Sequence, residues 1–225
     1  MKETGKILAV LCATQETEGL KRSIESLRRH GIEMYVYGMG QTWEGNGMKQ
    51  DAAQYAAEKF QGKFDYILSL DGYDTLCLAD EDEVLSKFMA FQNPMVICAE
   101  MNCWPNAKMA CRYPPARSDS PFRFLNAGAY MAQTDYLVAM LKDWGITKEF
   151  KADSDQGFVT ENFLSHPGCM VIDEACSLFQ SLCDVKPEQF FQSGKRFINK
   201  KTFQVPCVLH GNGHTNMDYY WDIIK

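Results

Sequence analysis

The sequence lacks an apolar run long enough to cross a membrane. No stretch approaches the roughly 18 consecutive apolar residues of a membrane-spanning helix. The start carries the basic residues Lys2 and Lys6, but the apolar stretch that follows is short and continues as a strand pattern. We therefore predict no signal peptide and no membrane span, and we expect a cytoplasmic protein.

The sequence also lacks paired cysteine motifs, although it contains nine cysteines. An odd count without any C-x-x-C pair does not predict a structural zinc site. Several of these cysteines lie in apolar strand-like runs, where cysteine packs as a small hydrophobic residue. Without a secretion signal, we expect reduced thiols.

A strong excess of one charge is absent as well. The net charge is -6 and the pI is near 5.3, which argues weakly against a surface for nucleic acid or anionic membranes. The segment from Lys195 to Lys201 is the one place where we would look for a contact with a phosphate backbone. With 225 residues, 46% of them hydrophobic, and no internal repeat, we expect a single domain over residues 1–225.

Strand and helix patterns alternate along the chain. Lys6–Thr14 is a continuous apolar run, typical of a strand buried on both faces of a parallel sheet. Glu16–His30 has helical spacing of apolar residues and Met34–Tyr37 is strand-like, so a parallel β-α-β unit is expected. Later strands are predicted at 65–70, 95–99, 122–132, 170–172, 178–182 and 205–209. Later helices are predicted at 48–60, 81–91 and 135–144, and a further helix follows residues 153–156 and ends at about residue 164. The polar and basic segment Pro187–Thr202 is predicted to be a surface excursion. This pattern predicts an α/β fold.

Acidic residues follow one of these strands directly. The run Ile67–Leu70 leads into Asp71 and Asp74, and ligands of open α/β sheets collect just past the carboxyl ends of strands. Two carboxylates there would suit Mg²⁺ or Mn²⁺ and a phosphorylated ligand. Carboxylates at this spacing are more often solvated or cap a turn, so the pair alone does not establish a metal site.

Two further polar clusters stand at comparable places. His210 follows the last apolar strand, and a neutral imidazole beside two carboxylates is a good Mn²⁺ set and a poor structural zinc set. Gly211 and Gly213 beside it favour close approach of phosphate oxygens to backbone N–H groups. Asp153 and Asp155 precede a helix, where acids also serve as ordinary N-terminal caps.

Glycine is dense from Gly38 to Gly47, with Trp43 in the middle. The third glycine of a dinucleotide-binding fingerprint is not in place, so we discount that motif. Trp43 is either a lid over the core or a flat ring on which a nucleobase stacks. Farther along, Gly128 indicates that another group approaches the backbone closely.

Together, these motifs resemble the glycosyltransferase domain of the procollagen lysyl hydroxylases, the procollagen galactosyl- and glucosyltransferase family. The likeness extends from about Lys6 almost to the C-terminus. Its motifs are Ala13-Thr14-Gln15-Glu16-Thr17-Glu18-Gly19, Gly38-x-Gly40-x-x-Trp43, Asp71-Gly72-Tyr73-Asp74, Glu100-x-x-Cys103-Trp104-Pro105, Tyr113-Pro114, Arg123-Phe124-Leu125-Asn126-x-Gly128, Asp153-Ser154-Asp155-Gln156, Phe179-Gln180 and His210-Gly211-Asn212-Gly213. The hydroxylase domains are absent, so the chain resembles a stand-alone transferase, such as a bacterium, phage or large virus could encode.

The resemblance implies a GT-A fold, Rossmann-like with a mixed, mostly parallel sheet, that uses Mn²⁺ and a UDP-sugar and retains the anomeric configuration. Its metal ligands match Asp71, Asp74 and His210. The UDP-sugar-binding residues implied are Thr14, Trp43, Lys49, Tyr73, Trp104, Asn126, Gly128, Gln156, Asn212 and Gly213. Asp155 or Asp153 matches the catalytic carboxylate. Ser154 interrupts the acidic run, so which acid acts is open; we favour Asp155. The loop between Trp43 and Lys49 is shorter than in the animal enzymes.

The expected reaction is transfer of glucose or galactose from a UDP-sugar to a hydroxyl group. A metal at the leaving diphosphate neutralises charge, and a carboxylate supports the oxocarbenium-like centre. The resemblance suggests hydroxylysine of a collagen-like peptide as the acceptor. A hydroxymethylated DNA base, a glycan or a lipid hydroxyl are alternatives, and a non-catalytic module that binds nucleotide sugars is a second reading.

Overall fold

The structure is a computed structural model that describes residues 5–115, 119–146 and 154–225. Its centre is a six-stranded sheet in the order β2-β1-β3-β6-β5-β7. The strands of this sheet are β1 (Ile7–Cys12), β2 (Glu33–Tyr37), β3 (Tyr66–Asp71), β5 (Met95–Glu100), β6 (Phe124–Gln133) and β7 (Val171–Ile172). The sheet is mixed, because β6 runs antiparallel to both of its neighbours, whereas the other pairs are parallel.

The first strand shows why the sheet is covered on both faces. Every residue of β1 is buried, and alternate side chains of a strand point to opposite faces. Leu8 and Val10 belong to one core cluster, while Ile7 and Ala9 belong to another. The predicted parallel β-α-β unit is confirmed, because β1 pairs in parallel with β2.

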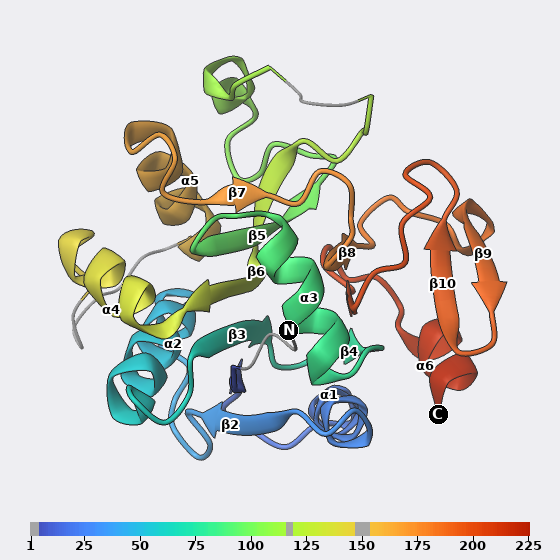
Figure 1. Cartoon of the computed structure of the whole chain (residues 1–225), viewed down its shortest axis with the longest axis horizontal. Helices are drawn as coiled ribbons and strands as arrows, with labels where there is room; N and C mark the ends of the chain where they lie inside the picture. The colour runs from blue at the N-terminus through green and yellow to red at the C-terminus, as the bar shows by residue number, and fades with distance from the viewer. Residues whose placement is uncertain (1–4, 116–118, 147–153) are drawn as a thin grey trace.

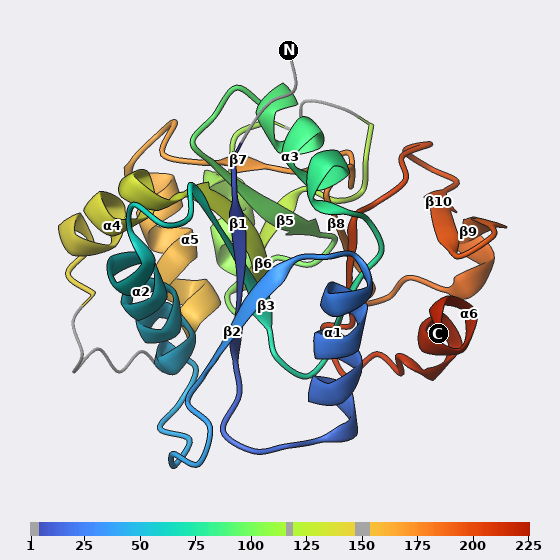
Figure 2. The same ribbon diagram turned by 60° about the horizontal axis from the view of Figure 1, so that its bottom comes forward.

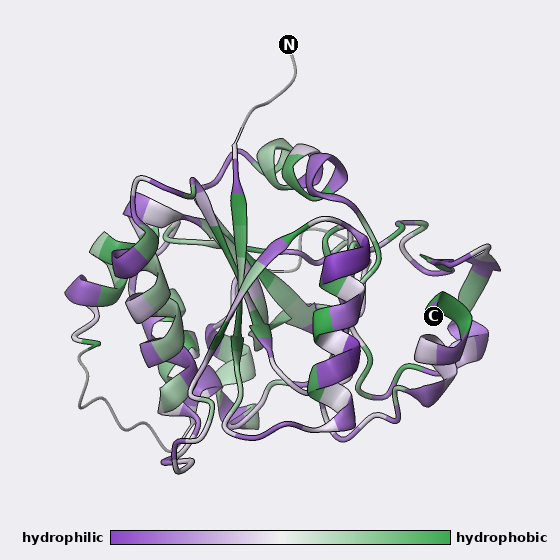
Figure 3. Cartoon of the chain, turned by 90° about the horizontal axis from the view of Figure 1, so that it is seen from below, coloured by the Kyte–Doolittle hydropathy of each residue, from purple (hydrophilic) through white to green (hydrophobic). Residues whose placement is uncertain are grey.

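Helices form a layer on each face of this sheet (Figure 2). One layer contains α2 (Gly47–Phe60), α4 (Thr134–Asp143) and α5 (Asp155–Ser165). The other contains α1 (Glu18–Arg29) and α3 (Glu81–Ala90). In Figure 3, β1 is hydrophobic through its middle, whereas α1 alternates between hydrophilic and hydrophobic residues, as expected for a helix with one face in water. No helix among the described residues is long and apolar enough to span a bilayer.

A smaller sheet lies beside the central one. It consists of β4 (Thr75–Cys77), β11 (Val208–His210) and β8 (Phe179–Ser181), in that order. β11 pairs antiparallel with β4, and His210 stands opposite Thr75. This pairing brings the last strand of the chain to the turn that follows β3.

The segment after β8 corrects a prediction. Pro187–Thr202 is not only a surface excursion, because it forms a short 3-10 helix, η2 (Pro187–Gln189), and a hairpin of β9 (Phe190–Ser193) and β10 (Arg196–Asn199). Phe190 and Phe197 are buried and pack edge-on against Tyr220 of α6 (Asp218–Ile224). The hairpin therefore has its own part of the core, at the right of Figure 1.

Candidate active site

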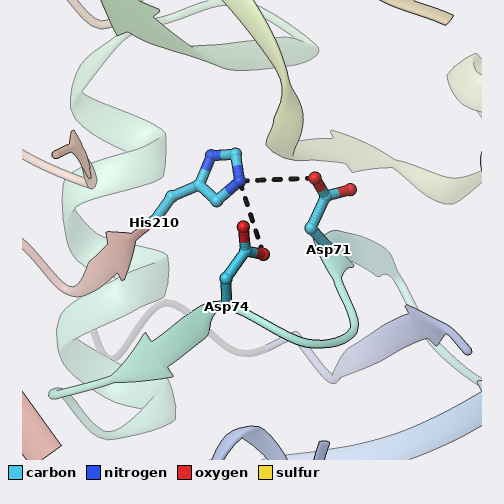
Figure 4. Close-up of side chains that lie close together, drawn as sticks. All are labelled: Asp71, Asp74 and His210. Atoms are coloured by element: carbon cyan, nitrogen blue, oxygen red, sulfur yellow. Dashed lines mark ion pairs between the residues drawn. The ribbon is translucent and has the colours of Figure 1, made fainter. Parts of the chain in front are cut away.

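Three predicted side chains meet where the two sheets adjoin. Asp71 is the last residue of β3, Asp74 lies in the turn before β4, and His210 is the last residue of β11. The His210 Nε2 atom is 3.3 Å from Asp71 Oδ2 and 3.7 Å from Asp74 Oδ1. Figure 4 shows the His210 ring pointing toward both carboxylates, with each pair marked by a dashed line. The backbone N–H of Gly211 also donates to the carbonyl oxygen of Asp74, at 2.7 Å. Residues more than 130 positions apart thus converge, because β4 and β11 are hydrogen-bonded neighbours.

This triangle fits a divalent cation. One ligand atom from each of the three residues lies within 4.8 Å of the others, and two carboxylates with an imidazole suit Mn²⁺. His210 is only 2% exposed, and its ring nitrogens have no hydrogen bond of ordinary geometry to any described residue. A buried, unsatisfied imidazole aimed at two acids is the arrangement that a metal ligand requires.

The three groups perturb one another. Burial alone would lower the pKa of His210, but Asp74 and Asp71 outweigh it and raise that pKa above its usual value. Burial also raises the pKa of Asp74, with a further contribution from Asp71. The pKa of Asp71 is lowered despite its burial, because Lys49 and His210 stabilise its ionised form.

Lys49, in the first turn of α2, links this triangle to the N-terminus of α5. Its Nζ atom is 2.8 Å from Asp71 Oδ1 and 2.9 Å from Asp155 Oδ2. Burial by itself would lower the pKa of Lys49, but the two carboxylates raise it above its ordinary value. Lys49 is therefore a fixed cation between the two acids.

At the N-terminus of α5, one residue caps the helix and the next one faces the site. Ser154 is the N-cap residue, and its Oγ accepts a hydrogen bond from the Gly157 backbone N–H at 3.0 Å. Asp155 is therefore not needed as the cap; its Oδ1 accepts from the Gln156 N–H and its Oδ2 pairs with Lys49. Asp153, the other candidate, lies outside the described residues.

Glu100, at the end of β5, is a site residue to which the sequence pattern gave no role. The residue is 4% exposed, and its carboxylate accepts hydrogen bonds from the amide groups of Asn126, Gln156 and Asn212. Burial raises its pKa, and these hydrogen bonds counteract that effect. The available signal was the acid that directly follows a fully apolar strand, the same signal that identified Asp71.

Gly128 confirms the predicted close approach. A Cβ atom at this position would stand 2.1 Å from His210 Cε1 and 2.7 Å from Asp71 Oδ2. The β6 backbone therefore lies directly against the triangle.

Two cavities meet at this triangle. The first, which we call the Trp43 cavity, has a volume of about 800 Å³. Its lining includes the predicted residues Thr14, Trp43, Lys49 and Tyr73. The Tyr73 hydroxyl accepts the backbone N–H of Thr14 at 2.9 Å, which holds the ring against the end of β1.

The second cavity, which we call the Trp104 cavity, has a volume of about 600 Å³. Its lining includes the predicted residues Trp104, Asn126, Gly128, Asp155, Gln156, His210, Asn212 and Gly213. Trp104 is 63% and Trp43 41% exposed, so each cavity has a solvent-accessible aromatic ring in its wall. The residues that line both cavities are Asn46, Lys49, Asp71, Asp74 and His214.

The sequence profile of the family described as PLOD GT domain matches residues 3–220, nearly the whole chain. The chain belongs to this family. The multifunctional procollagen lysine hydroxylase and glycosyltransferase LH3 of Rattus norvegicus is 29% identical over 94% of this chain. The procollagen-lysine,2-oxoglutarate 5-dioxygenase of Drosophila melanogaster is 30% identical over 95% of it.

The chain also resembles viral proteins. An uncharacterized protein of Acanthamoeba polyphaga mimivirus is 28% identical over 92% of the chain. The chain spans 30%, 31% and 46% of the lengths of the rat, fly and mimivirus relatives, respectively. Among solved structures, a glycosyltransferase involved in the glycosylation of the major capsid of PBCV-1 aligns with a TM-score of 0.59. That alignment covers 97% of this chain and 98% of the other at 14% identity, and it shows a glycosyltransferase fold.

Proposed function

We propose that this protein is a Mn²⁺-dependent retaining glycosyltransferase that moves a hexose from a UDP-sugar to a hydroxyl acceptor. The observation that carries the proposal is the position of the Asp71, Asp74 and His210 triangle, where the two cavities meet. A nucleotide sugar has a nucleoside at one end, a sugar at the other and a diphosphate between them. A site for it therefore needs two hollows, with a cation-binding cluster at their junction.

The cation would be held by Asp71, Asp74 and His210 and would act as a Lewis acid toward the leaving diphosphate. The protein supplies the positioning of the donor. In the Trp43 cavity, the exposed Trp43 ring offers a face for the uracil, and Tyr73 with Thr14 bounds the ribose side. In the Trp104 cavity, Glu100 accepts hydrogen bonds from the amide groups of Asn126, Gln156 and Asn212 and so fixes these side chains in the wall that would face the sugar.

Asp155 is the acid that we assign to the reacting carbon, with Asp153 as the alternative. Its side chain lines the Trp104 cavity and is 7% exposed. A carboxylate that is shielded from water in this way strongly stabilises positive charge at an oxocarbenium-like centre. Lys49 keeps Asp155 and Asp71 in one orientation before the donor arrives, which reduces the reorganisation that the reaction requires.

For the acceptor, we propose hydroxylysine of a collagen-like peptide. Support comes from the rat relative, whose name combines procollagen lysine hydroxylase and glycosyltransferase. The viral relatives leave a hydroxymethylated DNA base or a glycan as alternatives. The basic hairpin segment offers DNA little support, because Arg196 pairs with Glu83 and the Lys195 and Lys200 ammonium groups donate to backbone carbonyls.

A donor and acceptor panel tests the proposal. Each UDP-hexose is incubated with Mn²⁺ or EDTA, together with a hydroxylysine peptide, the matching lysine peptide, or DNA with and without hydroxymethylated bases. Mass spectrometry should show one hexose added to the hydroxylysine peptide only, with Mn²⁺ present, and release of UDP. Tight donor binding without hydrolysis or transfer would instead indicate a non-catalytic module. No binding of any UDP-sugar would refute the proposal.

A further inference from the structure

His214 stands at the junction of the two cavities, and no role follows for it from the family resemblance. It belongs to the loop between β11 and α6 and contributes to the lining of both the Trp43 and the Trp104 cavity. A diphosphate that connects a nucleoside in one cavity with a sugar in the other must pass the residues that line both. His214 is one of these few residues.

The charges at this junction leave a role for His214. Asp71 and Asp74 repel a diphosphate unless a cation lies between them. Lys49 could attract phosphate, but its ammonium group is already held between Asp71 and Asp155. The exposed imidazole of His214 has no hydrogen bond or ion pair with another described residue. Of the two basic residues that line both cavities, Lys49 and His214, only His214 therefore has an N–H group that is available to a phosphate oxygen.

The backbone at this position supports the same conclusion. Gly213 and His214 have φ values of 67° and 63°, and a residue with a side chain rarely adopts this left-handed conformation. The backbone N–H groups of both residues form no hydrogen bond within the described parts of the chain. Successive backbone N–H groups without a partner can bind an anion, and these two belong to the residue that carries the imidazole and to the residue before it.

We propose that His214 binds the diphosphate of the donor, with an imidazole N–H donating to a phosphate oxygen at the boundary between the two cavities. This inference rests on the proposed function, because it requires a nucleotide diphosphate as ligand. The triangle holds the cation, and His214 contacts the same diphosphate from the loop after β11.

The test compares two ligands that differ only in their phosphates. Isothermal titration calorimetry in the presence of Mn²⁺ measures the affinities of UDP and uridine for the wild type and two variants. His214→Gly removes the ring and suits the left-handed backbone, while His214→Asn suits the same backbone and keeps an N–H donor. His166→Asn is the matched control. His166 lies at the C-terminus of α5, whereas Asp155 lies at the N-terminus of this helix, and His166 lines neither cavity.

We expect His214→Gly to weaken UDP binding about tenfold, the typical effect of losing a hydrogen bond to a charged group. Uridine affinity should stay unchanged, and His214→Asn should recover part of the UDP affinity. The temperature of thermal unfolding should not fall in His214→Gly, because glycine relieves backbone strain at this position. The His166→Asn control should bind both ligands like the wild type.

Three results would overturn the inference. Unchanged UDP affinity in His214→Gly would show that the ring makes no phosphate contact. The proposed function would still stand in that case, because the wild type would bind UDP. Equal weakening of UDP and uridine would assign His214 to the nucleoside or to the shape of the loop. If the wild type binds neither UDP nor any UDP-sugar with Mn²⁺, the proposed function and this inference both fail.

Discussion

The backbone of Gly128 lies directly against the ring of His210. A Cβ atom at position 128 would stand 2.1 Å from His210 Cε1, far inside van der Waals contact. The same atom would be 2.7 Å from Asp71 Oδ2. The central strand β6 therefore has to present a bare backbone to the metal triangle, and only glycine provides one.

Gly128→Ala should accordingly displace His210 or Asp71. The added methyl group overpacks a buried site, which typically costs about 1–3 kcal/mol of unfolding free energy, and it separates the ligand atoms. We expect loss of Mn²⁺ binding by calorimetry, together with a lower urea midpoint. Gly62→Ala is a suitable control: Gly62 has a φ of 76° and no atom near its missing Cβ, so alanine strains the backbone and leaves the triangle intact. If Gly128→Ala bound Mn²⁺ like the wild type, the triangle would not be the cation site.

Asp74→Ala tests the metal assignment without overpacking. Asp74 lies in a turn, its side chain is one-third exposed, and its removal also relieves repulsion from Asp71. The variant should remain folded, lose Mn²⁺ affinity and lose essentially all Mn²⁺-dependent turnover. Asp222→Asn, which removes an exposed carboxylate paired with Lys225, should retain both. Wild-type turnover in Asp74→Ala would show that the assignment is wrong.

The sequence predicted Asp71 and His210, because each follows a largely apolar run and a polar side chain at the end of such a run leaves the core. The strand β4 was not predicted, since Thr75–Cys77 has only three residues and no long apolar run precedes it, and its partner β11 lies far along the chain. The hairpin was missed because the polar and basic residues from 187 to 202 outweigh Phe190 and Phe197 in composition.

The pairing of Lys49 illustrates a different limit. A lysine in the first turn of a helix is by default a solvated side chain. Its two partners belong to β3 and α5, and only the packing of α2 against both elements brings them together. The family resemblance implied a place for Lys49 near the nucleotide, but neither the resemblance nor the local sequence indicated the bridge between two acids.

Glu83 should make part of the stability depend on pH. Hydrogen bonds from Arg196, followed by Lys87, lower its pKa to about 2, against an ordinary value of 4.5, although burial opposes them. The Arg196 guanidinium contacts both carboxylate oxygens, at 2.8 and 2.7 Å, and joins the hairpin to α3. Because the folded-state pKa is depressed, this contribution is fully present above pH 4.5 and is lost as the pH falls toward 2.

Glu83→Gln should therefore lower the unfolding free energy at pH 6 by roughly 1 kcal/mol, as expected for a partly exposed pair. The difference from the wild type should shrink steadily below pH 4.5, in urea titrations followed by circular dichroism. Glu33→Gln, at an exposed position of β2, serves as the control and should show no such pH dependence. A Glu83→Gln deficit that stays constant down to pH 3 would show that the carboxylate charge is not its source.

Lys49→Met removes the cation between Asp71 and Asp155 while keeping a side chain of similar length. Breaking a buried ion pair by removing one partner typically costs about 3 kcal/mol or more, because two carboxylates are left without a counter-charge. A divalent cation at Asp71 can restore part of that charge, so Mn²⁺ should raise the unfolding temperature of Lys49→Met more than that of the wild type. Scanning calorimetry with Mn²⁺ and with EDTA measures both quantities. Lys225→Met, which breaks only an exposed pair with Asp222, should match the wild type in each condition. Wild-type stability of Lys49→Met in EDTA, together with a wild-type response to Mn²⁺, would show that Lys49 does not neutralise these acids. The site would then have to assemble around the metal alone.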